Sequence, residues 1–317
     1  EKEYAAGLFP VKQVYDSFTW EEGYDEYWDY DKTKMRTFNQ FYKEIIQRFE
    51  QYQLPVIEMG KDTPKEAVCL VFEKVNTGGV TLTVFELLTA TFAADNFSLR
   101  DDWQEIVKRF AREDVLKKIP SDDFLQAVTL LATMKRYREH VNGTDPDGRA
   151  PAISCKRKDI LKLKRDDYLE HRDAVVEGFL KAAKFLRMQK IFISRDLPYR
   201  TQIVPLAATL AVLGDEADND TVRKLLSRWY WCGVFGELYG STIESRFAKD
   251  LPELIAWVRG GDEPTAVKEA TFSGTRLKEL TSRRSAAYNG IFALMMRDGC
   301  EDFRSGQPID ITSYYDE

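Results

Sequence analysis

The chain has 317 residues and a formal net charge of −6, and 44% of its residues are hydrophobic. These values indicate a soluble globular protein with two domain-sized cores. An acidic balance argues against indiscriminate nucleic-acid binding, so any contact with DNA has to come from a local basic patch. No apolar run has the length of a membrane span, no signal peptide opens the chain, and the four cysteines lie far apart. We therefore expect a cytoplasmic protein with no membrane partner.

Few residues suit metal-dependent or nucleophilic catalysis. The two histidines, His140 and His171, are not at a metal-binding spacing, and we interpret both as solvated helix residues. Their placement argues against a histidine-based nuclease, a Ser-His-Asp triad and a two-histidine zinc site. Adjacent carboxylates such as Asp122 and Asp123 diverge by about 100° on a helix, so we interpret them as caps or solvated residues. We predict no metal site.

Residues 1–60 combine aromatic and acidic side chains. The run from Trp20 to Asp31 contains rings that can stack on bases or sugars, but its carboxylates repel phosphates, so we favour a packing and surface role. An amphipathic helix is predicted over residues 38–49 from the spacing of Phe38, Phe41, Ile45 and Phe49. Leu54–Met59 then reads as a short strand.

Residues 63–94 read as two helices joined by a polar glycine turn. Thr83 and Glu86 form a capping box for the second helix. A turn of this kind beside the free N–H groups of a helix start is typical of a site for phosphate or a metal-phosphate group. The candidate ligands are Glu73, Asn76, Thr77, Gly78 and Gly79. The alternative is a helix hairpin that needs its glycines only to turn.

After residue 97 the pattern is almost entirely helical and contains one strong basic cluster. Its members are Lys156, Arg157, Lys158, Lys162, Lys164 and Arg165. On one continuous helix several of them share a face, and such a face neutralises DNA phosphates. Asp159, Asp166 and Asp167 dilute the cluster, so a solvated helix face is the alternative.

A second polar set follows the tryptophan-rich helix that begins near Asp218, which we expect to be central to the second core. The set comprises Glu237, Tyr239, Arg246 and Asp250. Arg246 and Asp250 are four residues apart on a predicted helix and can form an ion pair. The alternative role is a salt-bridged helix end.

Several strings resemble one known family. Residues 72–82, Phe-Glu-Lys-Val-Asn-Thr-Gly-Gly-Val-Thr-Leu, resemble the signature near the end of the N-terminal domain of GmrSD-type restriction proteins. That domain is similar to the ParB nuclease and sulfiredoxin superfamily. Residues 153–161, 198–201 and 231–239 resemble the helical region that follows it, and residues 284–309 resemble the lead into the family's C-terminal domain.

The resemblance implies a mainly α fold in three parts. They are the second half of a ParB-like α+β domain (1–97), a helical domain (98–260) and the lead-in to a nuclease-type domain (261–317). The implied parent protein is a nucleotide-dependent restriction endonuclease of anti-phage defence that acts on modified or foreign DNA. Its implied cofactor is a nucleoside triphosphate with Mg²⁺, and its implied partners are DNA, nucleotide and a second copy of the chain.

Two family motifs are absent from this sequence. The Asp-Gly-Gln-Gln-Arg motif, linked in the family to nucleotide binding and hydrolysis, does not occur, and no His-Asn-His nuclease motif occurs before Glu317. We expect both in flanking residues of a longer polypeptide, so the catalytic residues stay unassigned and the chain alone is predicted not to cleave DNA. The rival functions are a non-catalytic ParB-like DNA-binding module and a helical scaffold.

Overall fold

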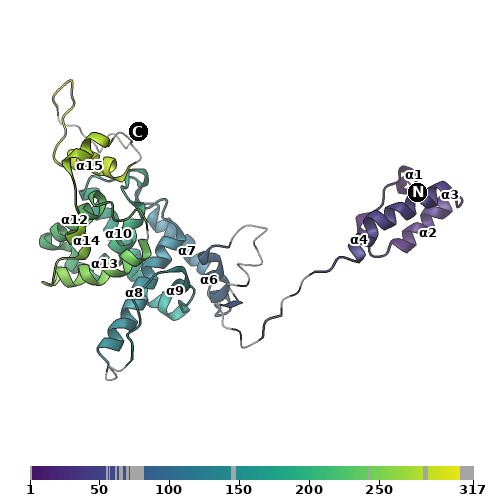
Figure 1. The fold of residues 1–317 in the computed structure, drawn as a ribbon, viewed down its shortest axis with the longest axis horizontal. Coiled ribbons are helices and arrows are strands. Elements are labelled where there is room, and N and C mark those ends of the chain that lie inside the picture. Colours follow the sequence, from purple (N-terminus) through teal and green to yellow (C-terminus); the bar gives the residue numbers. More distant parts are fainter. Residues whose placement is uncertain are drawn as a thin grey trace. The chain divides into compact units, whose positions relative to one another are not determined.

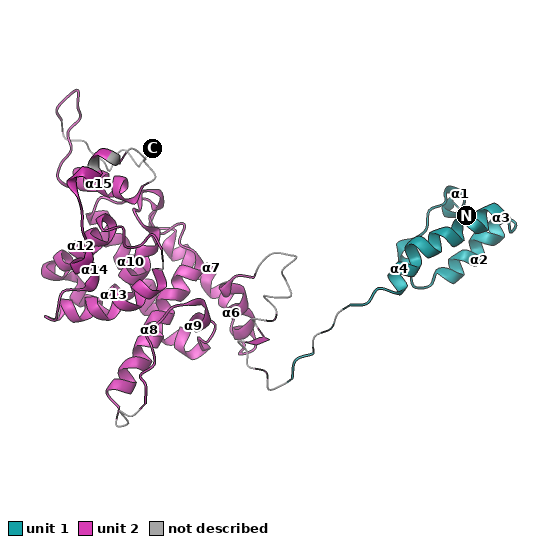
Figure 2. Cartoon of the chain, viewed as in Figure 1, with its two compact units in different colours: residues 1–62 teal, residues 63–317 magenta. Residues whose placement is uncertain are grey.

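The computed structural model describes residues 2–54, 56, 58–60, 63, 67–68, 71, 82–143, 148–241, 243–280 and 285–307. The chain divides into two compact units, residues 1–62 (unit 1) and residues 63–317 (unit 2), which are coloured separately in Figure 2. Helices dominate both units (Figure 1). The boundaries predicted at residues 97 and 260 stay predictions.

Unit 1 is a set of short helices around a cluster of aromatic side chains. In chain order the elements are α1 (Lys2–Ala6), the 3-10 turn η1 (Val11–Gln13), α2 (Ser17–Tyr27), α3 (Lys32–Phe41), the π-helical turn η2 (Tyr42–Ile46) and α4 (Gln47–Glu50). Trp20 stacks on Tyr24 and on Phe38, with ring centroids 5.0 and 5.5 Å apart. Aromatic side chains bury large apolar areas, so these three form the centre of the unit. At Trp20 and Tyr24 the aromatic run therefore serves packing.

The helix predicted over residues 38–49 forms with a π-helical turn inside it. This turn, Tyr42–Ile46, holds one residue more than an α-helical turn and shifts the later residues by about 100° around the axis. Ile46 is consequently fully buried, whereas Ile45 is 45% and Phe49 49% exposed. The regular spacing that placed Ile45 and Phe49 on the apolar face is therefore wrong for these two residues.

The short strand predicted over Leu54–Met59 is absent from the described residues of that range. Leu54, Val56, Glu58 and Met59 lie in neither helix nor strand, and Leu54 and Val56 are largely exposed. A strand needs a neighbour that satisfies its N–H and C=O groups, and the described part of the chain contains no sheet. The mainly α fold class is confirmed, while the ParB-like α+β part finds no support in these residues.

Unit 2 contains the longer helices of the chain. They are α6 (Val84–Ala93), α7 (Leu99–Phe110), α8 (Ser121–Val141), α9 (Arg157–Ile160), α10 (Arg165–Met188), α11 (Ile203–Leu213), α12 (Asp220–Phe235), α13 (Ile243–Val258), α14 (Thr265–Glu269) and α15 (Ala286–Arg297). Four 3-10 turns complete the described elements: η4 (Ser194–Asp196), η5 (Arg200–Gln202), η6 (Gly214–Asp218) and η7 (Gly274–Glu279). A bilayer-spanning helix, long and apolar along its whole length, is not found among those described.

Helix α11 is the central helix of unit 2. It has no charged residue, nearly all its side chains are buried, and it packs against α8, α10 and α13. A helix that is apolar all round belongs inside a core. The same argument applied to the sequence favoured α12, but α12 has a polar edge at Arg223, Lys224 and Arg228 and packs against α14 and α15. Trp229, Tyr230 and Val234 of α12 are nevertheless buried in this core, so α12 contributes to it as predicted, while α11 is the helix buried on all sides.

Helices α10 and α11 cross closely because Gly178 has no side chain. A Cβ atom at Gly178 would lie 2.9 Å from the Cβ of Ala211 and closer still to the carbonyl oxygen of Ala207. Real Cβ atoms do not approach neighbours so closely, so any larger residue has to push the two helices apart. The crossing thus brings the backbones of α10 and α11 together in the middle of the core.

Local capping signals were read correctly from the sequence. Thr83 Oγ1 accepts a hydrogen bond from the Glu86 N–H (3.2 Å), and the Glu86 carboxylate accepts one from the Thr83 N–H (2.7 Å). The side chains of Ser98 and Asn219 cap α7 and α12 in the same manner. Each of these interactions joins residues two or three apart, so it can be predicted without knowledge of the fold.

Candidate functional site

The basic cluster does not lie on one helix, as predicted, but on a helix and a turn. Helix α9 ends at Ile160, the chain turns through residues 161–164, and α10 begins at Arg165. Leu161 and Leu163 are both buried. These two residues would lie on opposite sides of one continuous α-helix, but residues 161–164 have left the helix. The prediction of a continuous basic helix is therefore wrong.

Four lysines of this segment form what we call the lysine strip: Lys156, Lys158, Lys162 and Lys164. All four are exposed, and the buried residues Ile160, Leu161 and Leu163 lie among them. Within the described part of the chain none of them forms an ion pair. Lysine ammonium groups in this state are available to bind anions such as phosphate.

The two arginines of the cluster hold helix α6 in place. Arg157 Nη2 donates to the carbonyl oxygen of Leu82 (3.3 Å), just before α6 begins. Arg165 Nη1 donates to the carbonyl oxygen of Asp95 (2.9 Å), just after α6 ends, and its other nitrogens bind the Asp166 carboxylate. These contacts give both guanidinium groups a structural role, and they connect α6 to the lysine strip.

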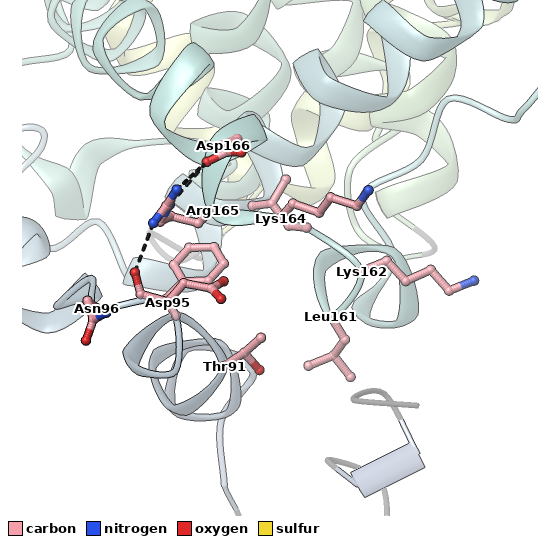
Figure 3. Close-up of a pocket in the computed structure, with 10 residues that line it drawn as sticks. Thr91, Asp95, Asn96, Leu161, Lys162, Lys164, Arg165 and Asp166 are labelled. Atoms are coloured by element: carbon pink, nitrogen blue, oxygen red, sulfur yellow. Dashed lines mark hydrogen bonds and ion pairs between the residues drawn. The ribbon is translucent and has the colours of Figure 1, made fainter. Parts of the chain in front are cut away.

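A pocket of about 640 Å³ lies between the end of α6 and the turn that carries part of the strip. Figure 3 shows Thr91 and Asp95 on one side of it and Leu161, Lys162 and Lys164 on the other. In this view the ammonium ends of both lysines point away from Thr91 and Asp95. The two lysines thus extend outward from the pocket.

A second pocket of about 450 Å³, the α8–α13 pocket, is lined by residues of α8, of α13 and of the segment from Pro151 to Asp159. Six residues that line it and bear on its chemistry are Arg136, Ser154, Lys156, Lys158, Asp159 and Glu244. Ser154 Oγ donates to Asp159 Oδ2 (2.6 Å), and Arg136 Nη2 binds Asp167 Oδ2 (2.6 Å). Ser154, Asp159 and Arg136 are therefore held in position by neighbouring groups.

The start of α8 carries two carboxylates that sequence analysis wrongly interpreted as caps or solvated residues. Asp123 is buried, and its Oδ2 lies 3.5 Å from Arg200 Nε. Burial raises the pKa of Asp123 to about 6, although the Arg200 charge acts to lower it. Burial also raises the pKa of Asp122, against the charge of Arg157. No local sequence signal distinguishes this burial from an ordinary helix start, because it depends on segments that are distant in sequence.

Two residues of the second polar set meet in the core. Tyr239 and Asp250 are both buried, and the Tyr239 hydroxyl donates a hydrogen bond to Asp250 Oδ2. Burial raises the pKa of Asp250 to about 7, while the Tyr239 hydroxyl and the charge of Arg246 act to lower it. The pair joins the end of α12 to α13 and has the character of a structural bond.

The other two residues of that set form ion pairs elsewhere. Arg246 Nη2 lies 3.2 Å from Glu269 Oε2, so its partner is not Asp250 as predicted. Glu237 binds Arg276, with 2.7 Å between Oε1 and Nη2. The four residues therefore divide into one buried hydrogen bond and two partly exposed ion pairs, which matches the alternative of a salt-bridged helix end.

The predicted phosphate-binding residues Glu73, Asn76, Thr77, Gly78 and Gly79 lie outside the described residues, so their role stays a prediction. Within the described ranges, no three His, Cys, Asp or Glu side chains are grouped to hold a metal ion. His171 is partly buried, with its pKa lowered by burial, and is not the solvated residue predicted from the sequence.

Comparison with known proteins supports the resemblance stated from the sequence. Residues 7–93 match the family model described as the N-terminal domain of the GmrSD restriction endonuclease. The chain is also 26% identical over 326 residues to the uncharacterized protein MJ0686 of Methanocaldococcus jannaschii. That alignment covers 88% of this chain and 51% of the archaeal protein, so the chain spans about half the length of this relative. The matched family segment ends with α6, the helix held by Arg157 and Arg165.

Proposed function

We propose that this chain is part of a nucleotide-dependent restriction endonuclease that acts on modified or foreign DNA. The observation that carries the proposal is the match of residues 7–93 to the N-terminal domain of GmrSD restriction endonucleases. Arg157 and Arg165 supply a structural reason to extend it to the rest of unit 2, since they join the last matched helix to the lysine strip. The chain then contributes part of a nucleotide-sensing domain and a helical linker domain.

In this proposal the lysine strip contacts the phosphate backbone of DNA. Its four ammonium groups are exposed and form no ion pair with the described residues, so within this part of the chain no ion pair has to be broken before they bind. Each phosphate that a lysine neutralises releases a counterion, and affinity then falls steeply as salt concentration rises. Such contacts position DNA on the protein without distinguishing one base from another.

The nucleotide part of the proposal concerns residues 73–79. Gly78 and Gly79 would present backbone N–H groups to the phosphates of a nucleoside triphosphate, and Glu73 with Asn76 would help to hold its Mg²⁺. Support comes from the sequence of the turn and from the family resemblance. The proposal assigns this segment no catalytic role, because the family motif linked to hydrolysis is absent from the sequence.

The DNA contact is tested by charge reversal within the strip. The double variant Lys158→Glu, Lys162→Glu should weaken DNA binding and reduce the slope of log affinity against log salt by about 2, or about 0.9 for each lost phosphate contact. The matched control is Lys118→Glu, Lys224→Glu, which changes two exposed lysines outside the strip. Equal slopes for the two double variants would contradict the assignment of the strip to DNA.

The nucleotide contact is tested by comparing two variants of the glycine turn. Asn76→Ala should keep the melting temperature of the free protein but lose the rise that a nucleoside triphosphate with Mg²⁺ produces. Gly78→Val should lower the melting temperature and the nucleotide response together, because we expect the turn to need a positive φ angle at one of its glycines, which a β-branched residue disfavours. If Asn76→Ala destabilises the free protein as much as Gly78→Val, Asn76 has a structural role only.

Cleavage requires its own assay. We expect the purified chain, incubated with modified or unmodified DNA, nucleotide and Mg²⁺ or Mn²⁺, to leave both strands intact. The reason is that neither motif linked to catalysis in the family occurs in its sequence. Strand cleavage that persists through repurification would reveal a carboxylate site within these residues.

A further inference from the structure

We propose that the α8–α13 pocket receives a single nucleotide turned out of the DNA helix and contacts its base. The inference rests on the proposed function, since it takes the lysine strip as a DNA contact. Phosphate contacts carry no information about the base. A restriction system that distinguishes modified from unmodified DNA therefore needs a second place where a base is contacted directly. Enzymes that must reach all edges of one base usually extrude it from the stack.

The position of the pocket fits this role. Lys156 and Lys158, half of the lysine strip, also line the pocket. A phosphate bound by these lysines would place the attached nucleotide at the pocket mouth. Helix α9, which carries Lys158, lies beside α8 (Figure 1), and Thr133 and Arg136 of α8 also line the pocket. The volume of about 450 Å³ lies within the range of about 300–1,000 Å³ typical of small-ligand sites.

The lining carries the acceptors that a base needs as well as cations for its phosphate. Asp159 and Glu244 bring two carboxylates into the same lining as Arg136, Lys156 and Lys158. A carboxylate is a good acceptor for the exocyclic amine of adenine or cytosine. Ile153 and Ala248 supply an apolar surface against which the plane of a base can rest.

The walls of the pocket are prearranged for binding. Thr133 Oγ1 donates to the carbonyl oxygen of Ser154 (3.0 Å) and accepts from the Ser154 N–H (3.2 Å). Ser154 Oγ in turn holds Asp159. Because these groups are already ordered, ligand binding loses less conformational entropy, and the affinity is higher.

The larger pocket beside α6 is less suitable. Its two lysines point outward in Figure 3, and its arginine, Arg165, is already bound to Asp95 and Asp166. The lining of the α8–α13 pocket is aliphatic where it is apolar, so base stacking on an aromatic ring does not contribute there. We therefore expect extrusion to depend strongly on how easily the base leaves its pair.

The experiment uses the 317-residue chain and two duplexes that differ at one position. One duplex contains 2-aminopurine opposite thymine and the other contains it opposite cytosine, which is a mismatch. The mismatched duplex should bind about tenfold more tightly, since extruding the base from a mismatch costs about 1.4 kcal/mol less than extruding it from a matched pair. The 2-aminopurine fluorescence should also rise on binding, because the probe leaves the base stack.

Two pocket variants and one control complete the test. Ala248→Trp fills the pocket and should abolish both the mismatch preference and the fluorescence rise, while the salt dependence on the matched duplex stays unchanged. Glu244→Gln keeps the shape of the pocket and should reduce the preference, so the test does not rely on one variant that has to fold. Thr91→Trp, placed in the other pocket, should leave both signals unchanged.

The outcomes separate this inference from the proposed function. Equal binding of both duplexes without a fluorescence change, or a preference that survives Ala248→Trp, would overturn the nucleotide pocket and leave the lysine contact standing. Failure of the chain to bind either duplex would overturn both proposals. A preference lost with Ala248→Trp and kept with Thr91→Trp would support the pocket.

Discussion

Unit 1 and unit 2 divide the charge of the chain unevenly. Residues 1–62 contain 13 acidic and 8 basic side chains, a net charge of −5, whereas residues 63–317 contain 39 and 38, a net charge of −1. Most of the excess of acidic over basic side chains therefore lies in unit 1. The overall value of −6 says little about the surroundings of the lysine strip, which lies in unit 2. For a chain of two compact units, net charge is informative unit by unit.

The two cores differ as well. The core of unit 1 is one cluster of aromatic side chains, and its helices are short, whereas unit 2 has longer helices arranged around α11. A small domain buries a smaller fraction of its surface and has less stability to lose. One core substitution should therefore unfold unit 1, while unit 2 should tolerate a substitution of similar cost.

The largest expected effect is that of Trp20→Ala. Removing a buried tryptophan costs about 3–5 kcal/mol, which is comparable to the whole stability of a small domain. Amide hydrogens of α2 and α3 should lose their protection from exchange, whereas those of α10 and α11 should keep it. The control is Tyr15→Ala, since Tyr15 is largely exposed. Loss of protection in both units would show that they unfold together.

Gly178→Ala should have the next largest effect and should act on unit 2. The added methyl group has no room between α10 and α11, so we expect a loss of about 1–3 kcal/mol in the free energy of unfolding. Thermal denaturation of the variant checks this value. Gly274→Ala is the control because no atom lies within 4 Å of the added Cβ. Equal melting temperatures for the two variants would contradict the close helix crossing.

Asp250 should make the stability of unit 2 depend on pH. Its pKa is raised from 3.8 to about 7, so between pH 4 and 7 the folded state holds a proton that the unfolded state has lost. Stability should therefore fall as pH rises through this window, by at most about 1.4 kcal/mol per pH unit, and the fall should be smaller in Asp250→Asn. Denaturant unfolding at several pH values measures it, with the exposed Asp262→Asn as control. Parallel profiles for wild type and Asp250→Asn would refute the assignment.

The smallest expected effect concerns the charge of unit 1. Glu22→Gln combined with Glu26→Gln removes two exposed negative charges from α2. DNA affinity should rise less than about twofold at 0.1 M salt, because the proposal assigns the DNA contact to the lysine strip of unit 2 and salt screens exposed charges that do not touch the DNA. A rise as large as the loss caused by Lys158→Glu, Lys162→Glu would mean that unit 1 acts directly on the bound DNA.

Local features of the fold were predictable from the sequence, and features that depend on distant segments were not. The Thr83–Glu86 capping box and the cap at Ser98 involve residues at most three apart. Asp123 is buried and pairs with Arg200 of η5, which is far away in the sequence, and the π-helical turn leaves no recognisable signal in residues 42–46. Spacing alone cannot reveal either feature.

At the candidate site, too, local features were predictable from the sequence and contacts between distant segments were not. Composition correctly identified residues 156–165 as the strongest basic segment. It did not reveal that Arg157 and Arg165 would bind the backbone on either side of α6, because that contact joins segments about 70 residues apart. The α8–α13 pocket also escaped sequence analysis, since its walls come from three separate stretches of the chain.

The π-helical turn at Tyr42–Ile46 affects how related sequences should be aligned. Because the turn contains one residue beyond an α-helical turn, deleting a single residue there yields an unbroken α-helix. Homologues one residue shorter at this place would keep Phe38 and the equivalent of Ile46 on the same buried face. A correct alignment of unit 1 then requires a one-residue gap in the middle of a helix, where gaps are ordinarily penalised.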